Sequence, residues 1–213
     1  MQHPTVIDLF CGCGGFGLGA ELAGFRSIAA IDVDRDLQSS YRLNFPGTRV
    51  VEADISKIDS DCWSDIIGSE RPDGIIGGPP CQGFSAIGKR DKNDIRNQLV
   101  SHFFRQINIL RPKFFVMENV EGILSAYGRE MIESSIENLL HPYTILEPQV
   151  IDAAKFGAAT RRRRAILVGY LPDEMAPIDP VKLFETKGIP QANVRRAIQD
   201  LPTPEPQSVE NGF

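Results

Sequence analysis

The chain has few cysteines, no excess of basic residues and no long uncharged apolar run. Its four cysteines, Cys11, Cys13, Cys62 and Cys81, lack the density and the spacing of a disulfide-linked secreted scaffold. No span has the character of a signal peptide or of a transmembrane helix, so we expect a cytoplasmic protein without a membrane partner. Cys11 and Cys13 have no second ligand pair at the spacing of a zinc site, so no metal is expected.

The charge balance is acidic. A formal charge of −5 and a pI near 5.3 argue against a surface that would hold a polyanion unaided, although a local basic patch is compatible with an acidic total. Hydrophobic residues make up 42% of the 213 residues. This fraction is enough for the core of one sizeable domain, and it excludes disorder as the overall state.

Short β-rich apolar runs alternate with segments of helical spacing. The expected strands are 6–10, 27–31, 49–51, 74–76, 114–117, 144–151 and 164–170, and the expected helices include 18–24, 36–45 and 97–110. This alternation predicts an α/β fold with a doubly wound, mostly parallel sheet. Only residues 152–163 separate the last two runs, too few for a helical crossover, so these runs are expected to form an antiparallel hairpin at one sheet edge.

The composition changes after Leu201. Prolines at 202, 204 and 206 prevent a strand or helix from continuing, so the segment is interpreted as a linker. We expect one domain over residues 1–201 and a linker over residues 202–213.

A glycine-rich turn follows the first expected strand, and an acidic residue follows each of the next two. Gly12, Gly14 and their neighbouring glycines let a ligand approach the backbone where the next helix begins. Asp32 has the position of an acid that accepts hydrogen bonds from ribose hydroxyls. Asp54 is open to two interpretations, a ligand contact or the N-cap of a helical turn. Together the three strand ends predict a site for a nucleotide-like cofactor.

One cysteine lies in a restricted loop after the expected strand 74–76, Gly77-Gly78-Pro79-Pro80-Cys81-Gln82-Gly83-Phe84-Ser85. The carboxyl end of a buried strand is where α/β enzymes hold a nucleophile, and the two prolines limit the freedom of the loop. A buried structural thiol is the alternative. Glu118 ends the next strand and would face the same crevice, although a salt-bridged acid is a frequent alternative at such a position.

Three segments together resemble the DNA cytosine-5 methyltransferases: Asp8-Leu9-Phe10-Cys11-Gly12-Cys13-Gly14-Gly15-Phe16, the loop around Cys81, and Met117-Glu118-Asn119-Val120. The resemblance covers about residues 6–202, with the motifs in the family's order. It implies an S-adenosyl-L-methionine-dependent methyltransferase domain, for which an edge hairpin is typical. It also implies double-stranded DNA with a flipped cytosine as substrate, in a restriction-modification or epigenetic context, at the nucleoid if the source is bacterial.

The resemblance further implies a set of residues for the S-adenosyl-L-methionine pocket. The positions that match the family's motifs are Phe10, Gly12, Gly14, Asp32, Val33, Asp54, Ile55, Pro80 and Leu99. Asp32 and Val33 replace the glutamate and large side chain that are more frequent in the family. Packing on the adenine is therefore expected to be looser.

The implied chemistry begins with a thiolate. Cytosine C5 is too weak a nucleophile to take a methyl group from a sulfonium directly, so electrons must first enter the ring by addition at C6. The resemblance implies that Cys81 makes this addition. Glu118, in an apolar pocket that favours its neutral form, is then expected to hydrogen-bond or protonate N3.

Four consecutive arginines, 161–164, precede and begin the last expected strand. Arg162 and Arg164 match the family's Gln-x-Arg-x-Arg motif and would lie on one face of the strand, one near the cytosine O2 and the other near the catalytic loop or the DNA backbone. Arg161 and Arg163 are expected to be solvated. Thr160 stands where the family usually has glutamine, so the DNA contact of that residue is in doubt.

The polar, basic segment 83–96 resembles the family's catalytic loop, which closes over DNA around the extruded base. Gln82 and Ser85 are expected to bind substrate, Ser85 near the DNA backbone. Asn119 is placed with this group and is expected to position the neighbouring backbone. The chain's histidines, which have no convincing partner in the sequence and receive no role, are His3, His102 and His141.

Nothing in the chain matches the family's target-recognition domain or its last two motifs, which complete the cofactor pocket. We therefore expect a catalytic half, namely a subunit of a split enzyme, a decayed fragment or a shortened chain, with a complementary chain as a partner. A tRNA cytosine-5 methyltransferase, a catalytically silent cofactor-binding module and a nicotinamide oxidoreductase are the alternatives. Gly83-Phe84-Ser85 favours DNA over tRNA, and the edge hairpin disfavours the oxidoreductase.

Overall fold

The computed structural model describes residues 3–80, 98–190 and 192–201. The strands are β1 (Thr5–Leu9), β2 (Arg26–Asp32), β3 (Arg49–Glu52), β4 (Gly74–Gly77), β5 (Phe114–Val120), β6 (Thr144–Ile145), β7 (Gln149–Asp152) and β8 (Arg163–Tyr170). The helices are α1 (Gly15–Leu22), α2 (Arg35–Asn44), α3 (Ser60–Ile67), α4 (Gln98–Leu110), α5 (Ala126–Glu137), α6 (Pro180–Leu183) and α7 (Val194–Ala197), with shorter 3-10 turns η1 (Ile55–Lys57), η4 (Glu121–Leu124) and η5 (Ala153–Phe156).

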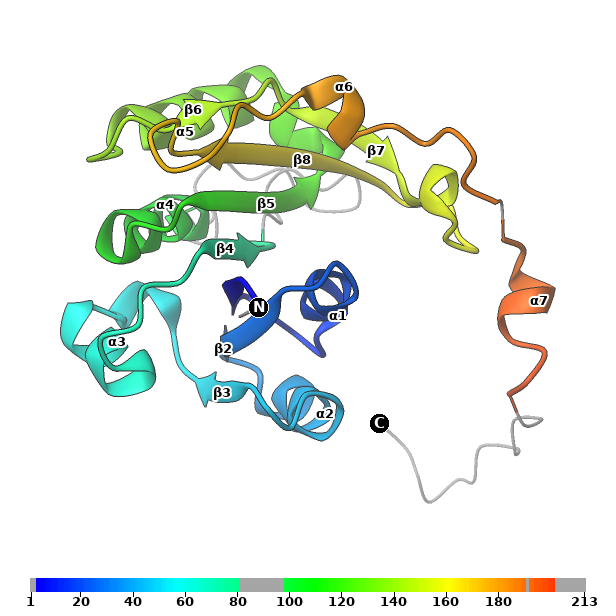
Figure 1. Ribbon diagram of the computed structural model, residues 1–213, viewed down its shortest axis with the longest axis horizontal. Helices are drawn as coiled ribbons and strands as arrows, with labels where there is room; N and C mark the ends of the chain where they lie inside the picture. Colours follow the sequence, from blue (N-terminus) through cyan, green and yellow to red (C-terminus); the bar gives the residue numbers. More distant parts are fainter. Residues whose placement is uncertain (1–2, 81–97, 191, 202–213) are drawn as a thin grey trace.

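All eight of these strands belong to one sheet of order β3-β2-β1-β4-β5-β8-β6, in which β7 also pairs with β8. The pairs from β3 through β5 are parallel, and β8 is antiparallel to β5, β6 and β7. Figure 1 shows α1 and α2 on one side of the sheet and α3 and α4 on the other. The doubly wound, mostly parallel sheet with an antiparallel edge is therefore confirmed.

The central strands are apolar because helices cover both of their faces. All five residues of β1 are buried, as are all four of β4. On the α4 side, Phe103, Phe104, Phe115 and Tyr143 meet edge to face, with ring centroids 5.5–6.2 Å apart. This core holds β4 and β5 side by side, so that their carboxyl ends lie at one edge of the sheet.

The expected strand 144–151 is wrong as a single element. It is divided into β6 and β7, and the break falls at Leu146, Glu147 and Pro148. Proline has no backbone N–H for a sheet ladder, which accounts for the interruption. Both pieces pair with β8, so the antiparallel arrangement holds, but β8 also pairs along the whole of β5 and is an interior strand.

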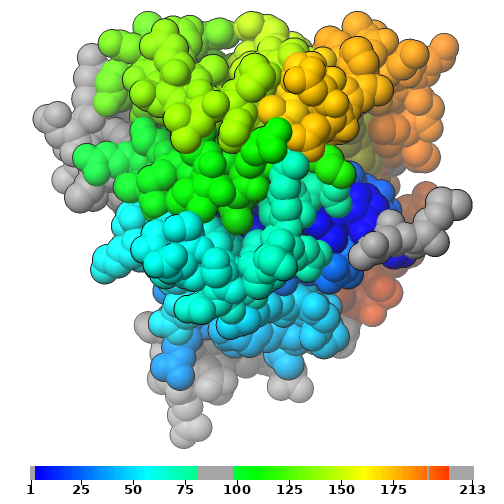
Figure 2. Space-filling model, turned by 60° about the vertical axis from the view of Figure 1, so that its left-hand side comes forward, coloured from blue at the N-terminus to red at the C-terminus, as the bar shows by residue number. Residues whose placement is uncertain are grey.

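Two longer helices, α3 and α5, were not expected from apolar periodicity. Each begins at a side-chain cap, Asp59 to the amide of Cys62 and Ser125 to the amide of Gly128. Figure 2 shows the orange segment that follows β8 lying against the green and yellow-green parts of the molecule. Glu174 in this segment forms ion pairs of 3.0 Å with Arg71 and Arg111, which lie before β4 and after α4.

The linker expected over 202–213 lies outside the described residues. Across the segments that are described, no helix combines the length and the apolar content needed to cross a membrane.

Candidate active site

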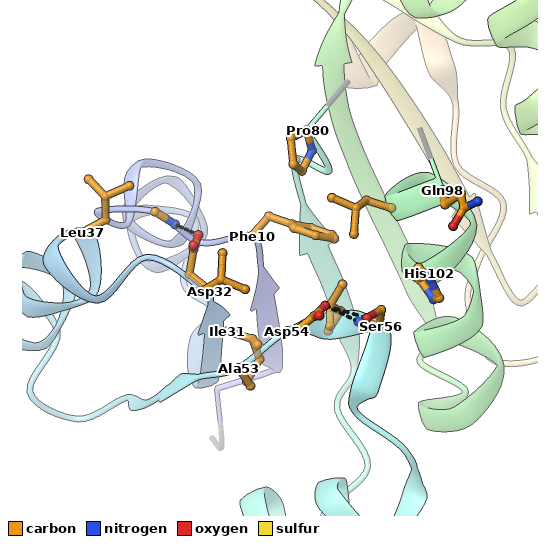
Figure 3. Close-up of a pocket in the computed structure, with 15 residues that line it drawn as sticks. Phe10, Ile31, Asp32, Leu37, Ala53, Asp54, Ser56, Pro80, Gln98 and His102 are labelled. Atoms are coloured by element: carbon orange, nitrogen blue, oxygen red, sulfur yellow. Dashed lines mark hydrogen bonds between the residues drawn. The ribbon is translucent and has the colours of Figure 1, made fainter. Parts of the chain in front are cut away.

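A pocket of about 600 Å³ lies over the carboxyl ends of β1, β2 and β4. The sheet order reverses between β1 and β4, and such a switch point is where open α/β sheets bind ligands. Figure 3 shows residues from the end of β2, from α4 and from the turn after β1 converging on it, with the Phe10 ring between Pro80 and Asp54. The lining residues are Phe10, Gly12, Ile31, Asp32, Val33, Leu37, Ala53, Asp54, Ile55, Ser56, Gly78, Pro80, Gln98, Leu99 and His102.

Eight of these lining residues were expected from the sequence, namely the whole expected cofactor set except Gly14. Gly14 instead begins α1 with φ +98°, and a methyl group there would collide with the ring of Phe45. Its missing side chain therefore serves packing between α1 and α2 below the pocket.

The glycine turn is held by Asp32 at the end of β2. One carboxylate oxygen accepts a 2.8 Å hydrogen bond from the amide of Gly12, and the other accepts a 2.9 Å bond from the amide of Asp34. Phe10 and Gly12 both have positive φ, 58° and 52°, a conformation that costs energy at Phe10. A carboxylate has about four lone-pair sites, so Asp32 keeps capacity for two ligand hydroxyls while it fixes the turn.

The cap interpretation of Asp54 is confirmed, and the ligand contact stays a prediction. Asp54 is the N-cap of η1 and accepts from the amide and the hydroxyl of Ser56, at 3.0 and 2.7 Å, and it also lines the pocket. These hydrogen bonds lower the pKa of Asp54 below its ordinary value. A carboxylate that is charged and fixed in direction is a suitable acceptor for an amino group.

Seven lining residues were not expected from the sequence: Ile31, Leu37, Ala53, Ser56, Gly78, Gln98 and His102. Most of them could have been inferred from their positions in the sequence, because they lie beside an expected residue at a strand end or within one helical turn of it. His102 received no role from the sequence, but it lies on the pocket face of α4, one turn after Gln98 and Leu99 (Figure 3).

Glu118 on β5 lies between two guanidinium groups. Its Oε1 is 2.9 Å from Nε of Arg164 and 3.4 Å from Nη2 of Arg162. The apolar surroundings expected for Glu118 are thus wrong, because the antiparallel pairing of β5 with β8 brings the arginines to the same edge. A methyl group on Gly78 would lie 3.3 Å from the other Glu118 oxygen, so the carboxylate also adjoins the wall of the pocket.

The other two arginines of the run lie apart from this cluster. Arg163 has a side chain 61% exposed and pairs at 2.8 Å with Glu121, itself largely exposed. Arg161 is exposed and forms no ion pair with any described residue.

Asn119, the neighbour of Glu118, is 4% exposed. Its side-chain amide donates a 2.9 Å hydrogen bond to the carbonyl of Pro79, and its oxygen accepts from the amide of Val120. It therefore acts on the backbone that leads to Pro80. Cys81, Gln82 and Ser85, with the segment 83–96, lie outside the described residues.

The sheet order and the pocket over its switch point define a fold of the S-adenosylmethionine-dependent methyltransferase type. The family model of the C-5 cytosine-specific DNA methylases matches residues 4–212, and the chain belongs to that family.

Relatives and a solved structure agree with this membership. Over 93% of its own length, the chain is 37% identical to the type II methyltransferase M.DdeI of Desulfomicrobium norvegicum. Over 96% of its own length, it is 39% identical to the type II methyltransferase M.XorII of Xanthomonas oryzae pv. oryzae. It superposes with a TM-score of 0.84 and 36% identity on the crystal structure of a protein described as a DNA modification methyltransferase encoded within a prophage (E. coli), covering 93% of this chain and 55% of that one. The chain spans 48% of each of the two curated relatives, about half of their length.

Proposed function

We propose that this chain is the catalytic half of a DNA cytosine-5 methyltransferase, which transfers a methyl group from S-adenosyl-L-methionine to C5 of a cytosine flipped out of double-stranded DNA. The observation that carries the proposal is the position of Glu118. Its carboxylate adjoins Gly78 in the pocket wall, and Pro80 of the same wall immediately precedes Cys81. Glu118, the pocket wall and the residue that precedes Cys81 thus lie at one sheet edge, which supports a reaction at a single base.

The pocket residues suit S-adenosyl-L-methionine. Asp32 has free acceptor positions for the ribose hydroxyls, and the lowered pKa of Asp54 keeps a charged acceptor for the adenine amino group. Phe10, Pro80 and Leu99 provide apolar surface against which a flat ring packs. When bound, the cofactor supplies an electrophilic methyl group on a sulfonium.

The proposed reaction runs through a covalent adduct between protein and base. The Cys81 thiolate adds to C6, while Glu118 holds or protonates N3 and the electron pair moves to C5. C5 then displaces the methyl group from sulfur, with S-adenosyl-L-homocysteine as the leaving group. Loss of the C5 proton and breaking of the bond between sulfur and C6 restore the thiolate and release 5-methylcytosine.

The arginines adjust Glu118 to this role. Both guanidinium groups contact Oε1 of Glu118, so a contact must shift before that oxygen can face N3. Arg162 has a side chain 56% exposed and the longer contact, which makes it the one free to turn toward DNA. Arg164, at 24% exposure and with the shorter contact, keeps Glu118 in place.

The adduct provides the test. DNA that carries 5-fluorocytosine should become covalently attached to the wild-type chain in the presence of S-adenosyl-L-methionine, because fluorine at C5 cannot leave as a proton does. The adduct accumulates, so even slow reaction is detected. Cys81→Ser should form none, and Cys62→Ser, which alters a cysteine on α3, should behave as wild type. An adduct with Cys81→Ser would overturn the assignment of Cys81 as the nucleophile. An adduct with tRNA that carries 5-fluorocytosine, and none with the DNA, would change the substrate.

We further propose that a complementary polypeptide, equivalent to the half that the longer relatives possess in addition, completes the enzyme. Uncovered apolar side chains support this. Of thirteen exposed large hydrophobic residues in the described chain, three lie on α1 and α2 outside the pocket (Leu18, Leu22 and Leu43), and six lie between residues 181 and 201. Leu22 and Leu43 are 81% and 83% exposed. Figure 1 shows α7 at a distance from the sheet, on the same side as α1 and α2. Apolar surface of this extent is typical of an interface.

Activity measurements test this partner. The chain alone is expected to produce no more than traces of 5-methylcytosine in unmethylated DNA, measured by mass spectrometry. The C-terminal half of one of the longer relatives, supplied as a separate chain, should increase this yield. Leu22→Lys should abolish the increase without changing the thermal stability of the isolated chain. Full activity of the chain alone, or equal stimulation of the variant, would contradict the partner. The reaction would take place in the cytoplasm, at the nucleoid in a bacterium.

A further inference from the structure

The pocket has one imidazole among its lining residues, His102. It lies on α4, four residues after Gln98, and therefore on the same face of the helix. Figure 3 shows both side chains on the wall opposite Asp32, and Ser56 and Asp54 below them. His102 thus stands at the end of the pocket to which Asp54 and Ile55 contribute.

A rigid arginine lies behind this imidazole. The two terminal nitrogens of Arg105 donate to three backbone carbonyls around η1, those of Ile58 at 2.9 Å, Ile55 at 2.7 Å and Ser56 at 3.1 Å. Its Nε–H donates to Nδ1 of His102 at 3.3 Å. Because the guanidinium is planar and held at three points, the direction of this last bond is set by the backbone of η1.

The contact with Arg105 determines which nitrogen of His102 holds the proton. A guanidinium N–H can only donate, so Nδ1 of His102 must accept and be unprotonated. Burial and the charge of Arg105 both lower the pKa of His102, and Asp54 opposes them more weakly. The ring is therefore neutral near pH 7, and its single proton is on Nε2. His102 consequently presents one N–H donor of fixed direction.

We propose that His102 is a cofactor-binding residue, whose Nε2–H donates a hydrogen bond to a ring nitrogen of the adenine of S-adenosyl-L-methionine. Arg105 is its positioning residue. The inference rests on the proposed function, since it needs this cofactor. The ring nitrogens of adenine are acceptors, whereas the carboxylates of Asp32 and Asp54 can only accept. The hydroxyl of Ser56 is already donated to Asp54 at 2.7 Å. A side-chain donor at this end must come from α4.

Analogues of S-adenosyl-L-homocysteine test the bond atom by atom. The 1-deaza, 3-deaza and 7-deaza compounds each replace one ring nitrogen by C–H and keep the shape of the base. Calorimetric titration of the wild type should show one of the three binding about tenfold more weakly than the parent compound, as expected for a lost hydrogen bond. His102→Phe keeps the ring but has no donor, so it should bind the parent about tenfold more weakly and no longer discriminate against that analogue.

Two further variants separate this role from a structural one. His102→Gln retains an N–H donor and should recover part of the discrimination, while Gln98→Leu, on the same helix face, should leave the ratio between the compounds as in the wild type. Circular dichroism should show that all variants are folded. Discrimination that survives in His102→Phe, or none in the wild type, would overturn the inference and leave the proposed function intact. Failure of the wild type to bind S-adenosyl-L-homocysteine at all would overturn both.

Discussion

Asn119 on β5 donates a 2.9 Å hydrogen bond to the backbone carbonyl of Pro79, two residues before Cys81. The bond joins the end of β5 to the chain that leaves β4, and its donor is 4% exposed. Both strand ends converge here because β4 and β5 are parallel and in register from Gly74 with Phe114 to Gly77 with Met117. The contact therefore fixes the end of β5, which bears Glu118, to the backbone at Pro79.

Asn119→Ala is expected to reduce turnover and leave cofactor binding nearly unchanged. The substitution leaves the Pro79 carbonyl without this partner, which allows the chain before Cys81 to shift and costs about 1–3 kcal/mol of stability. We expect kcat to fall at least tenfold while the Kd for S-adenosyl-L-homocysteine changes less than threefold. Asn138→Ala, which removes a 2.7 Å bond at the exposed end of α5, is the control and should retain activity. A higher Kd for S-adenosyl-L-homocysteine with normal kcat would place Asn119 in the cofactor site instead.

Two neighbouring arginines of β8, Arg163 and Arg164, should differ in their effect on adduct formation. Arg164→Ala removes the 2.9 Å contact that holds Glu118 and should slow adduct formation with 5-fluorocytosine DNA by tenfold or more. Arg163→Ala removes a pair between two exposed side chains, an interaction of little energy, and should change the rate less than twofold. The measurement is the single-turnover rate of adduct formation under saturating DNA. Similar losses in both variants would point to a general effect of positive charge on DNA affinity.

The sequence sufficed for features that depend on local pattern. Alternation of apolar runs located six of the eight described strands as single elements and joined the other two in one run, and glycine and acid positions located most of the pocket. It failed where contacts arise between distant segments. The surroundings of Glu118 depend on the pairing of β8 with β5, which brings Arg162 into contact although it lies 44 residues further along the chain. The position of His102 depends on Arg105 reaching the carbonyls of η1, 47 to 50 residues away. No local pattern contains either relationship.

Two glycines of α1 provide a matched pair. A methyl group on Gly17 would lie 2.4 Å from the hydroxyl of Tyr41 and 3.0 Å from a carboxylate oxygen of Asp8, whereas one on Gly19 meets nothing within 4 Å. Gly17→Ala should destabilise the fold by about 1–3 kcal/mol, because the buried neighbours must shift. Gly19→Ala should stabilise it by about 0.5–1 kcal/mol, the usual gain in a helix. Urea denaturation measures both, and an equal effect of the two substitutions would contradict the packing of α1 on α2.

Asp8 should make stability depend on pH in a direction opposite to that of most carboxylates. It is 1% exposed on β1, and its Oδ1 has no hydrogen-bond partner among the described residues. Burial raises its pKa from 3.8 to about 7, against the smaller effects of the Gly17 amide and the Tyr41 hydroxyl. The folded protein therefore keeps a proton that the unfolded chain releases, and stability from this group falls as pH rises from about 4 to about 7. The loss is on the order of a few kcal/mol.

Asp8→Asn tests this dependence, because it cannot ionise. The free energy of unfolding, measured in urea between pH 5 and pH 8, should fall in the wild type relative to the variant as pH rises, and the two curves should become parallel above about pH 7. Other carboxylates titrate in both proteins and cancel in the difference. Curves that are parallel over the whole range would mean that Asp8 is already ionised in the folded protein at pH 5. Its buried charge would then need a partner that the Gly17 amide and Tyr41 do not supply.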